Sequence, residues 1–282
     1  MDGRARAPAA GTVLNALATG KGSAFAIDEY VTATVSLGGD TVTGTVEGQP
    51  DADTSLVERC VELVLETCGG ANGGTIRTES DVPIASGLKS SSAAANATVL
   101  ATLSALGDVD EMTREEAARL GVEAARDAGV TVTGAFDDAS ASMLGGLTIT
   151  DNTEDALLVR DTVDWAVAVW LPPVQAFSAE ASVERCERIA PMADLVHELA
   201  LAGRYGTAMT VNGFAYAAAL DRPAEPMIEA LPAVAGVSLS GTGPSYVAVG
   251  DPDAIDDVET AWQKRDGRTI RTTTQTEGAK IE

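Results

Sequence analysis

Apolar residues recur along the chain with the spacing of helices. In residues 55–67 they fall at the three- and four-residue intervals that place one apolar face on a helix. An alanine-rich apolar run at 90–106 predicts a second helix, more deeply buried than the first. Thr113, followed three residues later by Glu116, forms a capping box, so a third helix is expected from there to about Ala128.

Other stretches have the composition of strands. Residues 4–7 predict a short strand that ends at Pro8, and residues 24–37 predict a long one. A Gly-Gly-Asp turn then predicts that residues 41–46 return as its hairpin partner. The Gly-, Thr- and Asp-rich stretch 129–146 has no clear period and is interpreted as a loop.

Strand and helix patterns intermix without a strict strand–helix–strand alternation, and this favours the α+β class. A strongly apolar strand at 165–171 is followed by several helical patterns, so a second unit is expected there. We therefore predict two domains, residues 1–158 and residues 159–282.

Charge changes the picture of the surface. The chain has 42 acidic and 19 basic residues, a net charge of −23, and only four lysines. Such a surface repels nucleic acid and anionic membranes. Because the acids are dispersed along a chain of ordinary hydrophobicity, they are typical of adaptation to high salt, as in halophilic archaea.

Several classes of protein are disfavoured by what the sequence lacks. No apolar run approaches the ~20 residues that span a bilayer, and no signal-peptide pattern follows Met1, so a cytoplasmic protein is expected. The three cysteines form no Cys-x-x-Cys pair, which favours reduced thiols. His197 is the only histidine, and this excludes a multi-histidine metal site.

The candidate chemistry begins at residues 81–96, where a turn leads into the first turn of a helix. Pro83 and Gly87 interrupt regular structure, and three serines follow Lys89. A helix start carries amide groups without intrahelical partners and the positive end of the helix dipole, which together attract phosphate. The alternative is a well-capped core helix without a ligand.

Two further stretches carry candidate residues. Asp137 and Asp138 are adjacent carboxylates in a Gly- and Thr-rich segment. A carboxylate near a bound phosphate can accept a hydroxyl proton or hold Mg²⁺, although an Asx turn that caps the next helix is the alternative. Residues 238–245, with the sequence Ser-Leu-Ser-Gly-Thr-Gly-Pro-Ser, predict a tight turn between two strands.

The pattern Pro-x-x-x-Gly-Leu-x-Ser-Ser-x-Ala at 83–93 resembles the ATP-binding signature of the GHMP kinases, and the other motifs follow in that family's order. Within the family, Gly-Leu-Lys-Ser-Ser-Ser, Val-Thr-Val-Thr-Gly-Ala-Phe-Asp-Asp-Ala and Asn-Ala-Leu-Ala-Thr-Gly-Lys-Gly are similar to the archaeal shikimate kinases. Lys89 departs from the Gly or Ser usual in other branches. Asn15 and the Gly-Lys-Gly stretch likewise replace the glycine-rich first motif of the sugar kinases.

The resemblance implies a two-domain GHMP-kinase-like fold with the active site between the domains. It also implies transfer of the γ-phosphoryl group of ATP, with Mg²⁺, to the 3-hydroxyl of shikimate. It implies ATP contacts for Pro83, Ala85, Ser86, Gly87, Leu88, Lys89, Ser90, Ser91, Ser92, Ala93, Ala94 and Ala95, and substrate contacts for Asn15, Lys21, Gly241, Thr242 and Gly243.

The family's catalytic aspartate precedes a Gly-Gly pair at a spacing that Asp138 fits better than Asp137, so Asp138 is the first candidate for the base and Asp137 the second. Lys89 or Lys21 is expected to offset developing charge. The hydroxyl of Ser91 or Ser92 is expected on Mg²⁺. Glu123 or Asp127 is a candidate second ligand of the metal.

Three alternatives remain open at this point. The chain could be another GHMP kinase that acts on homoserine or a different hydroxy acid. It could be a non-catalytic nucleotide-binding protein on the same fold, or an acidic structural module without affinity for ATP. ATP and a small-molecule acceptor are the expected partners, nucleic acid and membranes are not, and the oligomeric state is open.

Overall fold

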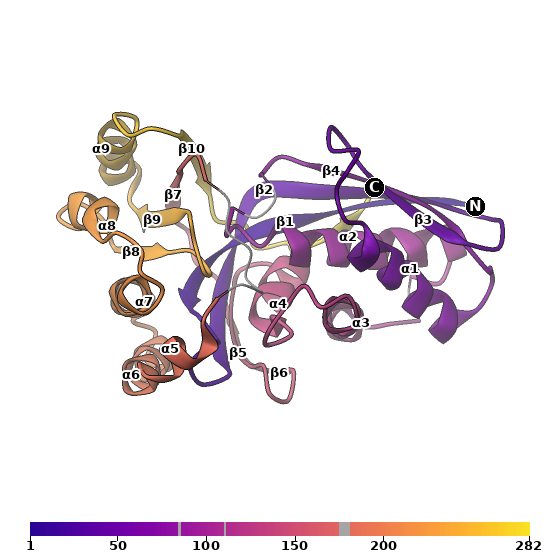
Figure 1. The fold of residues 1–282 in the computed structure, drawn as a ribbon, viewed down its shortest axis with the longest axis horizontal. Coiled ribbons are helices and arrows are strands. Elements are labelled where there is room, and N and C mark those ends of the chain that lie inside the picture. The colour runs from indigo at the N-terminus through magenta and orange to yellow at the C-terminus, as the bar shows by residue number, and fades with distance from the viewer. Residues whose placement is uncertain (84–85, 110, 175–180) are drawn as a thin grey trace.

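The computed structural model describes residues 1–83, 86–109, 111–174 and 181–282, which form two sheets and the helices packed on them (Figure 1). The larger sheet has seven strands: the path β11-β1-β2-β4-β3, with β5 paired to the other end of β2 and β6 paired to β5. The smaller sheet has four strands in the order β10-β7-β9-β8. The strands are β1 (Asp2–Leu14), β2 (Lys21–Leu37), β3 (Val42–Val46), β4 (Gly74–Ser80), β5 (Leu147–Asp151), β6 (Ala156–Asp161), β7 (Ala166–Leu171), β8 (Gly236–Leu239), β9 (Tyr246–Gly250), β10 (Arg268–Thr273) and β11 (Lys280–Ile281).

Helices cover the sheets in two groups (Figure 1). The first group packs on the larger sheet and comprises α1 (Ser55–Cys68), α2 (Ser90–Leu106), α3 (Arg114–Asp127) and α4 (Phe136–Leu144). The second group lies with the smaller sheet and comprises α5 (Val183–Glu187), α6 (Ala190–Leu201), α7 (Tyr205–Ala219), α8 (Glu225–Ala230) and α9 (Pro252–Trp262). None of the helices in the described ranges is both long enough and apolar enough to cross a bilayer.

The first strand is longer than predicted. β1 continues through Pro8 to Leu14, and its register against β2 shifts between Pro8 and Ala10. The expected end at Pro8 is therefore wrong. Proline has no N–H to donate to the ladder, and a bulge beside it lets pairing resume instead of ending the strand.

The predicted hairpin is also wrong. β2 pairs antiparallel with β4, and β3 pairs with β4 in parallel, so β4 lies between the two strands that the turn joins. The turn residues determine only the local bend, whereas the strand that pairs with β3 lies more than twenty residues later in the chain. The third difference is α4, which lies inside the stretch interpreted as a loop.

The larger core lies between the seven-stranded sheet and α1–α4. α2 is buried along nearly its whole length, from Ala93 to Ala105, which explains why its apolar residues show no single face. Two further cores lie on the two faces of β7, whose side chains alternate between them. Val167 and Val169 face a core shared with β1, β2, α6 and α7, whereas Ala168 and Trp170 face α7, α8 and α9. A strand buried on both faces is apolar throughout, as the sequence showed.

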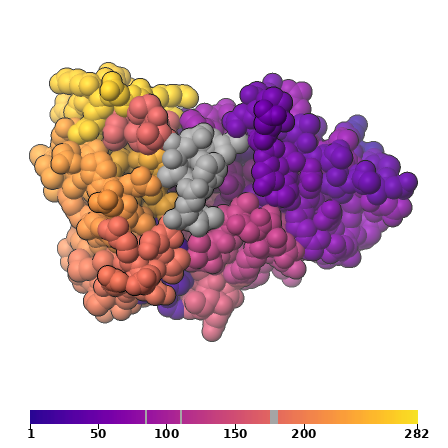
Figure 2. All heavy atoms as spheres, viewed as in Figure 1, coloured from indigo at the N-terminus to yellow at the C-terminus, as the bar shows by residue number. Residues whose placement is uncertain are grey.

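The α+β class is confirmed. Figure 2 shows the indigo and magenta part of the molecule on one side and the orange and yellow part on the other. The two sheets are not two consecutive segments, because β6 extends the larger sheet to Asp161 and β11 returns to pair with β1. A domain boundary after residue 158 stays a prediction.

Candidate active site

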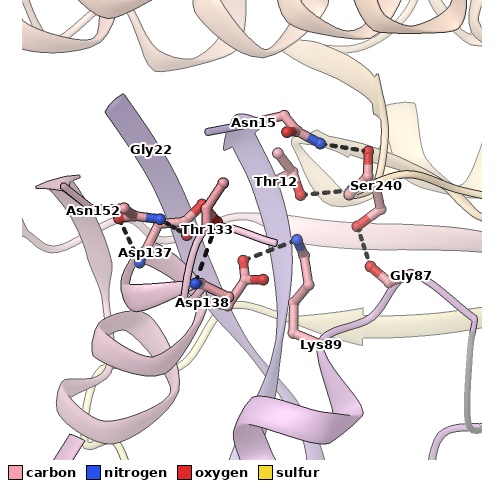
Figure 3. Close-up of polar contacts among 12 residues, drawn as sticks. Thr12, Asn15, Gly22, Gly87, Lys89, Thr133, Asp137, Asp138, Asn152 and Ser240 are labelled. Atoms are coloured by element: carbon pink, nitrogen blue, oxygen red, sulfur yellow. Dashed lines mark hydrogen bonds and ion pairs between the residues drawn. The ribbon is translucent and has the colours of Figure 1, made fainter. Parts of the chain in front are cut away.

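A cavity of about 650 Å³ lies where segments distant in sequence meet. The starts of α2 and α4 form its polar end, with residues 15–17 and residues 241–242 beside them. Residues 49–56 and residues 121–135 form the rest of the lining. Figure 3 shows the polar end, where side chains from α2, α4 and the strands converge.

Lys89 is the residue that precedes α2, and its backbone adopts the left-handed conformation with φ of 63°. Its Nζ lies 2.8 Å from Oδ1 of Asp138, with 9% and 13% of the two side chains exposed (Figure 3). The ammonium also touches the glycine loop, since a Cβ atom on Gly241 would lie 3.1 Å from Nζ. Among the described residues, Lys89 is the only cationic side chain that lines the cavity.

The start of α4 has the same backbone feature. Ala135 precedes the helix with φ of 55°, and Asp137 and Asp138 occupy the first turn. Carboxylates at this end of a helix are stabilised by the dipole. The two side chains take different environments: Asp138 faces Lys89, whereas Asp137 is 3% exposed and packs against β2 and β5.

A short network holds Asp137. The amide Nδ2 of Asn152 donates to Oδ1 of Asp137 at 2.7 Å, and the backbone N–H of Asp137 donates to Oδ1 of Asn152 at 3.1 Å. The hydroxyl of Thr150 donates to the same Oδ1 of Asn152 at 2.7 Å. Gly22 leaves room for the carboxyl group, because a Cβ atom there would lie 2.6 Å from it. Burial, with the negative charge of Asp138 added, raises the pKa of Asp137 to about 7, although Lys89 opposes the shift.

The glycine-rich loop joins two other segments. The hydroxyl of Ser240 donates to the carbonyl of Gly87 at 2.8 Å (Figure 3). Gly87 has φ of 85°, and a Cβ atom on it would lie 2.5 Å from the carbonyl oxygen of Ser240, so only glycine fits this approach. The N–H of Gly241 donates to Thr12 at 2.8 Å, and its carbonyl accepts from the amide of Asn15 at 2.9 Å.

The cavity brings together many of the residues predicted from the sequence. Its lining includes Lys89, Asp137 and Asp138, six of the predicted ATP contacts and three of the predicted substrate contacts. These are Gly87, Lys89, Ser90, Ser91, Ser92 and Ala95, and Asn15, Gly241 and Thr242 respectively. Pro83, Ser86, Leu88, Ala93, Ala94 and Gly243 lie outside that lining, and Ala85 falls outside the described residues.

Lys21, predicted as a substrate contact, lies at the start of β2. Its ammonium pairs with Oδ2 of Asp151 at the end of β5, and it does not line the cavity. The hydrogen bond from Lys21 holds the pKa of Asp151 at about 2, below its ordinary value. Lys21 therefore has a carboxylate partner within the fold.

The acids proposed beside the serines also lie elsewhere. Glu123 and Asp127 are exposed on α3 and do not line the cavity, and Asp127 pairs with Arg59 at 2.8 Å. Asp51 and Asp53 line the cavity instead, on the loop before α1. Across the described residues, no three His, Cys, Asp or Glu side chains cluster as a metal site would require.

Sequence reasoning missed the residues outside the lining that hydrogen-bond to the segments of the cavity. Asn152 directly follows a buried strand and is itself buried, so its amide requires a partner, but it stands in a run of polar residues that gave no signal for this. Tyr216, with Asn212 one turn earlier, lies in an alanine-rich helix, where a buried hydroxyl and a buried amide require partners. Thr12 gave no signal of its own, because threonine is common in strands.

Comparison with known proteins identifies the family. The model of the GHMP kinases N terminal domain matches residues 55–146. The shikimate kinase of Halobacterium salinarum is 64% identical over 282 residues, which cover 99% of this chain and 99% of that protein. The shikimate kinase of Methanosarcina mazei is 51% identical, with 99% and 96% covered. The chain belongs to the GHMP-family shikimate kinases.

Solved structures agree on the fold. The homoserine kinase of Cytophaga hutchinsonii superimposes with a TM-score of 0.78 at 20% identity, over 100% of this chain and 97% of that one. The mevalonate kinase of Methanococcus jannaschii gives 0.78 at 16% identity, over 96% and 98%. At this identity the likeness establishes the architecture alone.

Proposed function

We propose that this protein transfers the γ-phosphoryl group of ATP to the 3-hydroxyl of shikimate, giving shikimate 3-phosphate and ADP, for the synthesis of chorismate and the aromatic amino acids. The observation that carries the proposal is the 64% identity to a shikimate kinase over nearly the whole of both chains. The cavity supports it, because a carboxylate, a lysine and a serine-rich helix start converge there.

The start of α2 is the proposed phosphate site. No side chain caps this helix and its first turn contains no acidic residue, so its positive end has no internal counter-charge. Gly87 and Ser90–Ser92 form a narrow approach with small side chains and hydroxyl groups. The triphosphate of ATP would receive amide and hydroxyl hydrogen bonds there.

Asp138 is the proposed general base. Its carboxylate would accept the proton of the 3-hydroxyl while that oxygen attacks the γ-phosphorus. The bond between the phosphorus and the β–γ bridging oxygen then breaks, and ADP leaves with those electrons. Asp138 suits this role better than Asp137, because Asp137 is buried more deeply and its Oδ1 already accepts from Asn152.

Lys89 has two proposed roles. Its charge, 2.8 Å from Oδ1 of Asp138, would hold that carboxylate in place at the polar end of the cavity by ion pairing. The same ammonium, between α2 and Gly241, would offset the charge that builds on the transferring phosphoryl group. Among the described residues, the lining has one lysine and four aspartates, which cannot neutralise a triphosphate, so a divalent cation is expected with ATP.

The oxygen donors of the cavity fit Mg²⁺. Hydroxyl groups of Ser91 or Ser92, together with phosphate oxygens, are the hard ligands that this ion prefers, and Mg²⁺ on nucleotides commonly has one or two protein ligands. When bound, the ion would supply charge neutralisation at the phosphates. Glu123 and Asp127 are not proposed as ligands, because they face away from the cavity.

A second candidate function is phosphorylation of homoserine by the same site. It is favoured only by the fold, which matches a homoserine kinase structure at 20% identity. The acidic surface adds a condition to any assay, because carboxylate repulsion at a net charge of −23 is screened by salt. Assays in molar KCl are therefore the appropriate test.

The test measures ADP release with ATP and Mg²⁺ in the presence of shikimate, homoserine or no acceptor. Shikimate-dependent release is expected, with NMR of the product showing phosphate on the 3-oxygen. Release that depends on homoserine alone would replace the acceptor and keep the kinase assignment. ATP binding without release in any arm would leave a nucleotide-binding protein and overturn the proposal.

A further inference from the structure

We propose that Tyr216 on α7 is a positioning residue for the phosphoryl acceptor, although it does not line the cavity. It would act by holding the turn at residues 15–18, which joins β1 to β2 and borders the acceptor side of the cavity. The inference rests on the proposed function in one respect, namely that an acceptor binds between this turn and Asp138.

Tyr216 bonds the backbone of the turn on both sides of its bend. Its hydroxyl donates to the carbonyl of Asn15 at 2.7 Å and accepts from the N–H of Ala18 at 3.2 Å. The tyrosine is fully buried in the core around the smaller sheet. One side chain from the second group of helices therefore satisfies two backbone groups of a turn that belongs to the larger sheet.

Asn212 lies one helical turn before Tyr216 and extends the same attachment. Its Oδ1 accepts from the N–H of Asn15 at 3.0 Å, and its Nδ2 donates to the hydroxyl of Ser238 at 3.1 Å. Residues four apart on a helix share a face, so the pair forms one surface of α7. That surface fixes the backbone of Asn15, whose own amide reaches Gly241.

The attachment has a functional consequence because the turn itself contributes to the cavity. Asn15, Ala16 and Leu17 line it, and neither Tyr216 nor Asn212 does. A turn that shifts by a fraction of an ångström would misplace the acceptor relative to Asp138. The phosphate site at α2 is attached through Gly87 and Ser240 instead, so nucleotide binding should be less affected.

The chain contains a matched control for this role. Tyr246 is also buried and also donates its hydroxyl to a backbone carbonyl, that of Pro223, at 2.7 Å. It lies in the same core, but its hydroxyl bonds Pro223 and not the backbone of the turn at 15–18. Tyr216→Phe and Tyr246→Phe each remove one buried hydroxyl, and each should lower the thermal midpoint by a few degrees, Tyr216→Phe by more because its hydroxyl has two backbone partners.

The two variants are compared in steady-state kinetics after thermal unfolding has shown that both fold. Tyr216→Phe should raise KM for the acceptor by about three- to tenfold, the scale of one lost hydrogen-bonded pair, with KM for ATP changed less than twofold. Tyr246→Phe should leave both constants within twofold. Equal effects of the two variants, or an equal rise in both constants for Tyr216→Phe, would overturn the inference.

Amide hydrogen exchange separates this inference from the proposed function. Tyr216→Phe should increase exchange at Ala18, and Tyr246→Phe should not, whatever acceptor the enzyme uses. Unchanged exchange at Ala18 shows that Tyr216 does not hold the turn. If the wild type releases no ADP with shikimate but does so with homoserine, the proposed substrate fails while the KM comparison is made with homoserine. If neither acceptor works, the exchange result decides whether the turn is held, and the positioning role is withdrawn with the reaction.

Discussion

The helices α2 and α4, which begin at the polar end of the cavity, differ from α3, which begins at the surface. At the surface, α3 has a complete capping box: the hydroxyl of Thr113 accepts from the N–H of Glu116 at 3.2 Å, and the carboxylate of Glu116 accepts from the N–H of Thr113 at 2.8 Å. At the polar end of the cavity, α2 and α4 have no side-chain cap, and Lys89 and Ala135 precede them in the left-handed conformation.

The left-handed backbone distinguishes the cavity helices more sharply than the missing cap. In the part of the chain that the structure describes, α1 and α5–α9 also lack a side-chain cap, but their preceding residues all keep negative φ. This holds for α1 although its first residues line the cavity, so the left-handed start belongs to α2 and α4 at the polar end. A non-glycine residue in this conformation costs about 1–2 kcal/mol. Strain of this kind persists where the surrounding structure holds it, and it is frequent at functional sites.

The two cavity helices then use their positive ends differently. α4 places Asp137 and Asp138 in its own first turn, so its dipole stabilises carboxylates of the chain. α2 has serines there and no acid, which leaves its positive end for an external anion. The cap of α3 thus stabilises the helix itself, whereas the positive ends of α2 and α4 are placed at the proposed chemistry.

The largest expected effect tests the carboxylate at the start of α4. Asp138→Asn keeps the shape of the side chain and removes the proton acceptor, so kcat should fall by about 10²-fold or more. Steady-state kinetics with shikimate measure it, and KM for ATP serves as the internal control. A near-normal kcat would remove Asp138 from the role of base and make Asp137 the next candidate.

The next effect tests the strained residue before α2. Lys89→Met keeps most of the side-chain volume and removes the charge, so kcat should fall by roughly 10- to 10²-fold, the scale of a lost electrostatic contact to the transition state. Lys264→Met makes the same chemical change on an exposed residue outside the cavity and should leave kcat unchanged. Similar kinetics in both variants would show that the charge at Lys89 is not used.

A pH dependence should separate the two aspartates of α4. The pKa of Asp137 is raised in the folded protein from 3.8 to about 7, so its contribution to stability is present below pH 4 and is lost as pH rises through 7. The side chain in Asp137→Asn cannot ionise. The free energy of unfolding of this variant should therefore rise relative to that of the wild type as pH increases from 5 to 8. Urea unfolding at constant KCl measures this difference, and a difference independent of pH would contradict the assigned shift.

The smallest effects test the comparison of helix starts directly. Ala135→Gly relieves the left-handed strain before α4 and should raise the free energy of unfolding by up to about 1 kcal/mol. Thr113→Ala removes the cap of α3 and should lower it by about 1 kcal/mol, with kcat unchanged. Urea unfolding of both variants tests this pair. A loss of stability in Ala135→Gly would show that its conformation is not strained.

Prediction from the sequence succeeded where the signal was local. The helices at 55–67 and 90–106 were predicted because their composition is apolar over several turns, and α3 because its capping box lies within four consecutive residues. α4 was missed, since Asp, Ser and Gly around it favour turns and its burial is supplied by distant strands. The pairing of β3 was wrong because turn chemistry does not select a neighbour across the sheet.

The candidate site divides in the same way. The sequence identified Lys89, Asp137 and Asp138 through a family pattern, and the fold brings all three to one cavity. It did not identify Asn152 or Tyr216, because the partner of each, Asp137 and Asn15, is brought to it only by the fold. Lys21 illustrates the converse: a lysine in a glycine-rich stretch suggested a ligand, and the structure pairs it with Asp151.

By itself the sequence determined the α+β class, the family and the acidic, lysine-poor character of the surface, because these depend on composition and on residues close together in the chain. Only the tertiary structure decided that Asp138 faces Lys89 while Asp137 is buried against Gly22 and Asn152. The two aspartates are adjacent and chemically identical. Their difference comes from burial and from partners on other strands and helices, which exist only once the chain has folded.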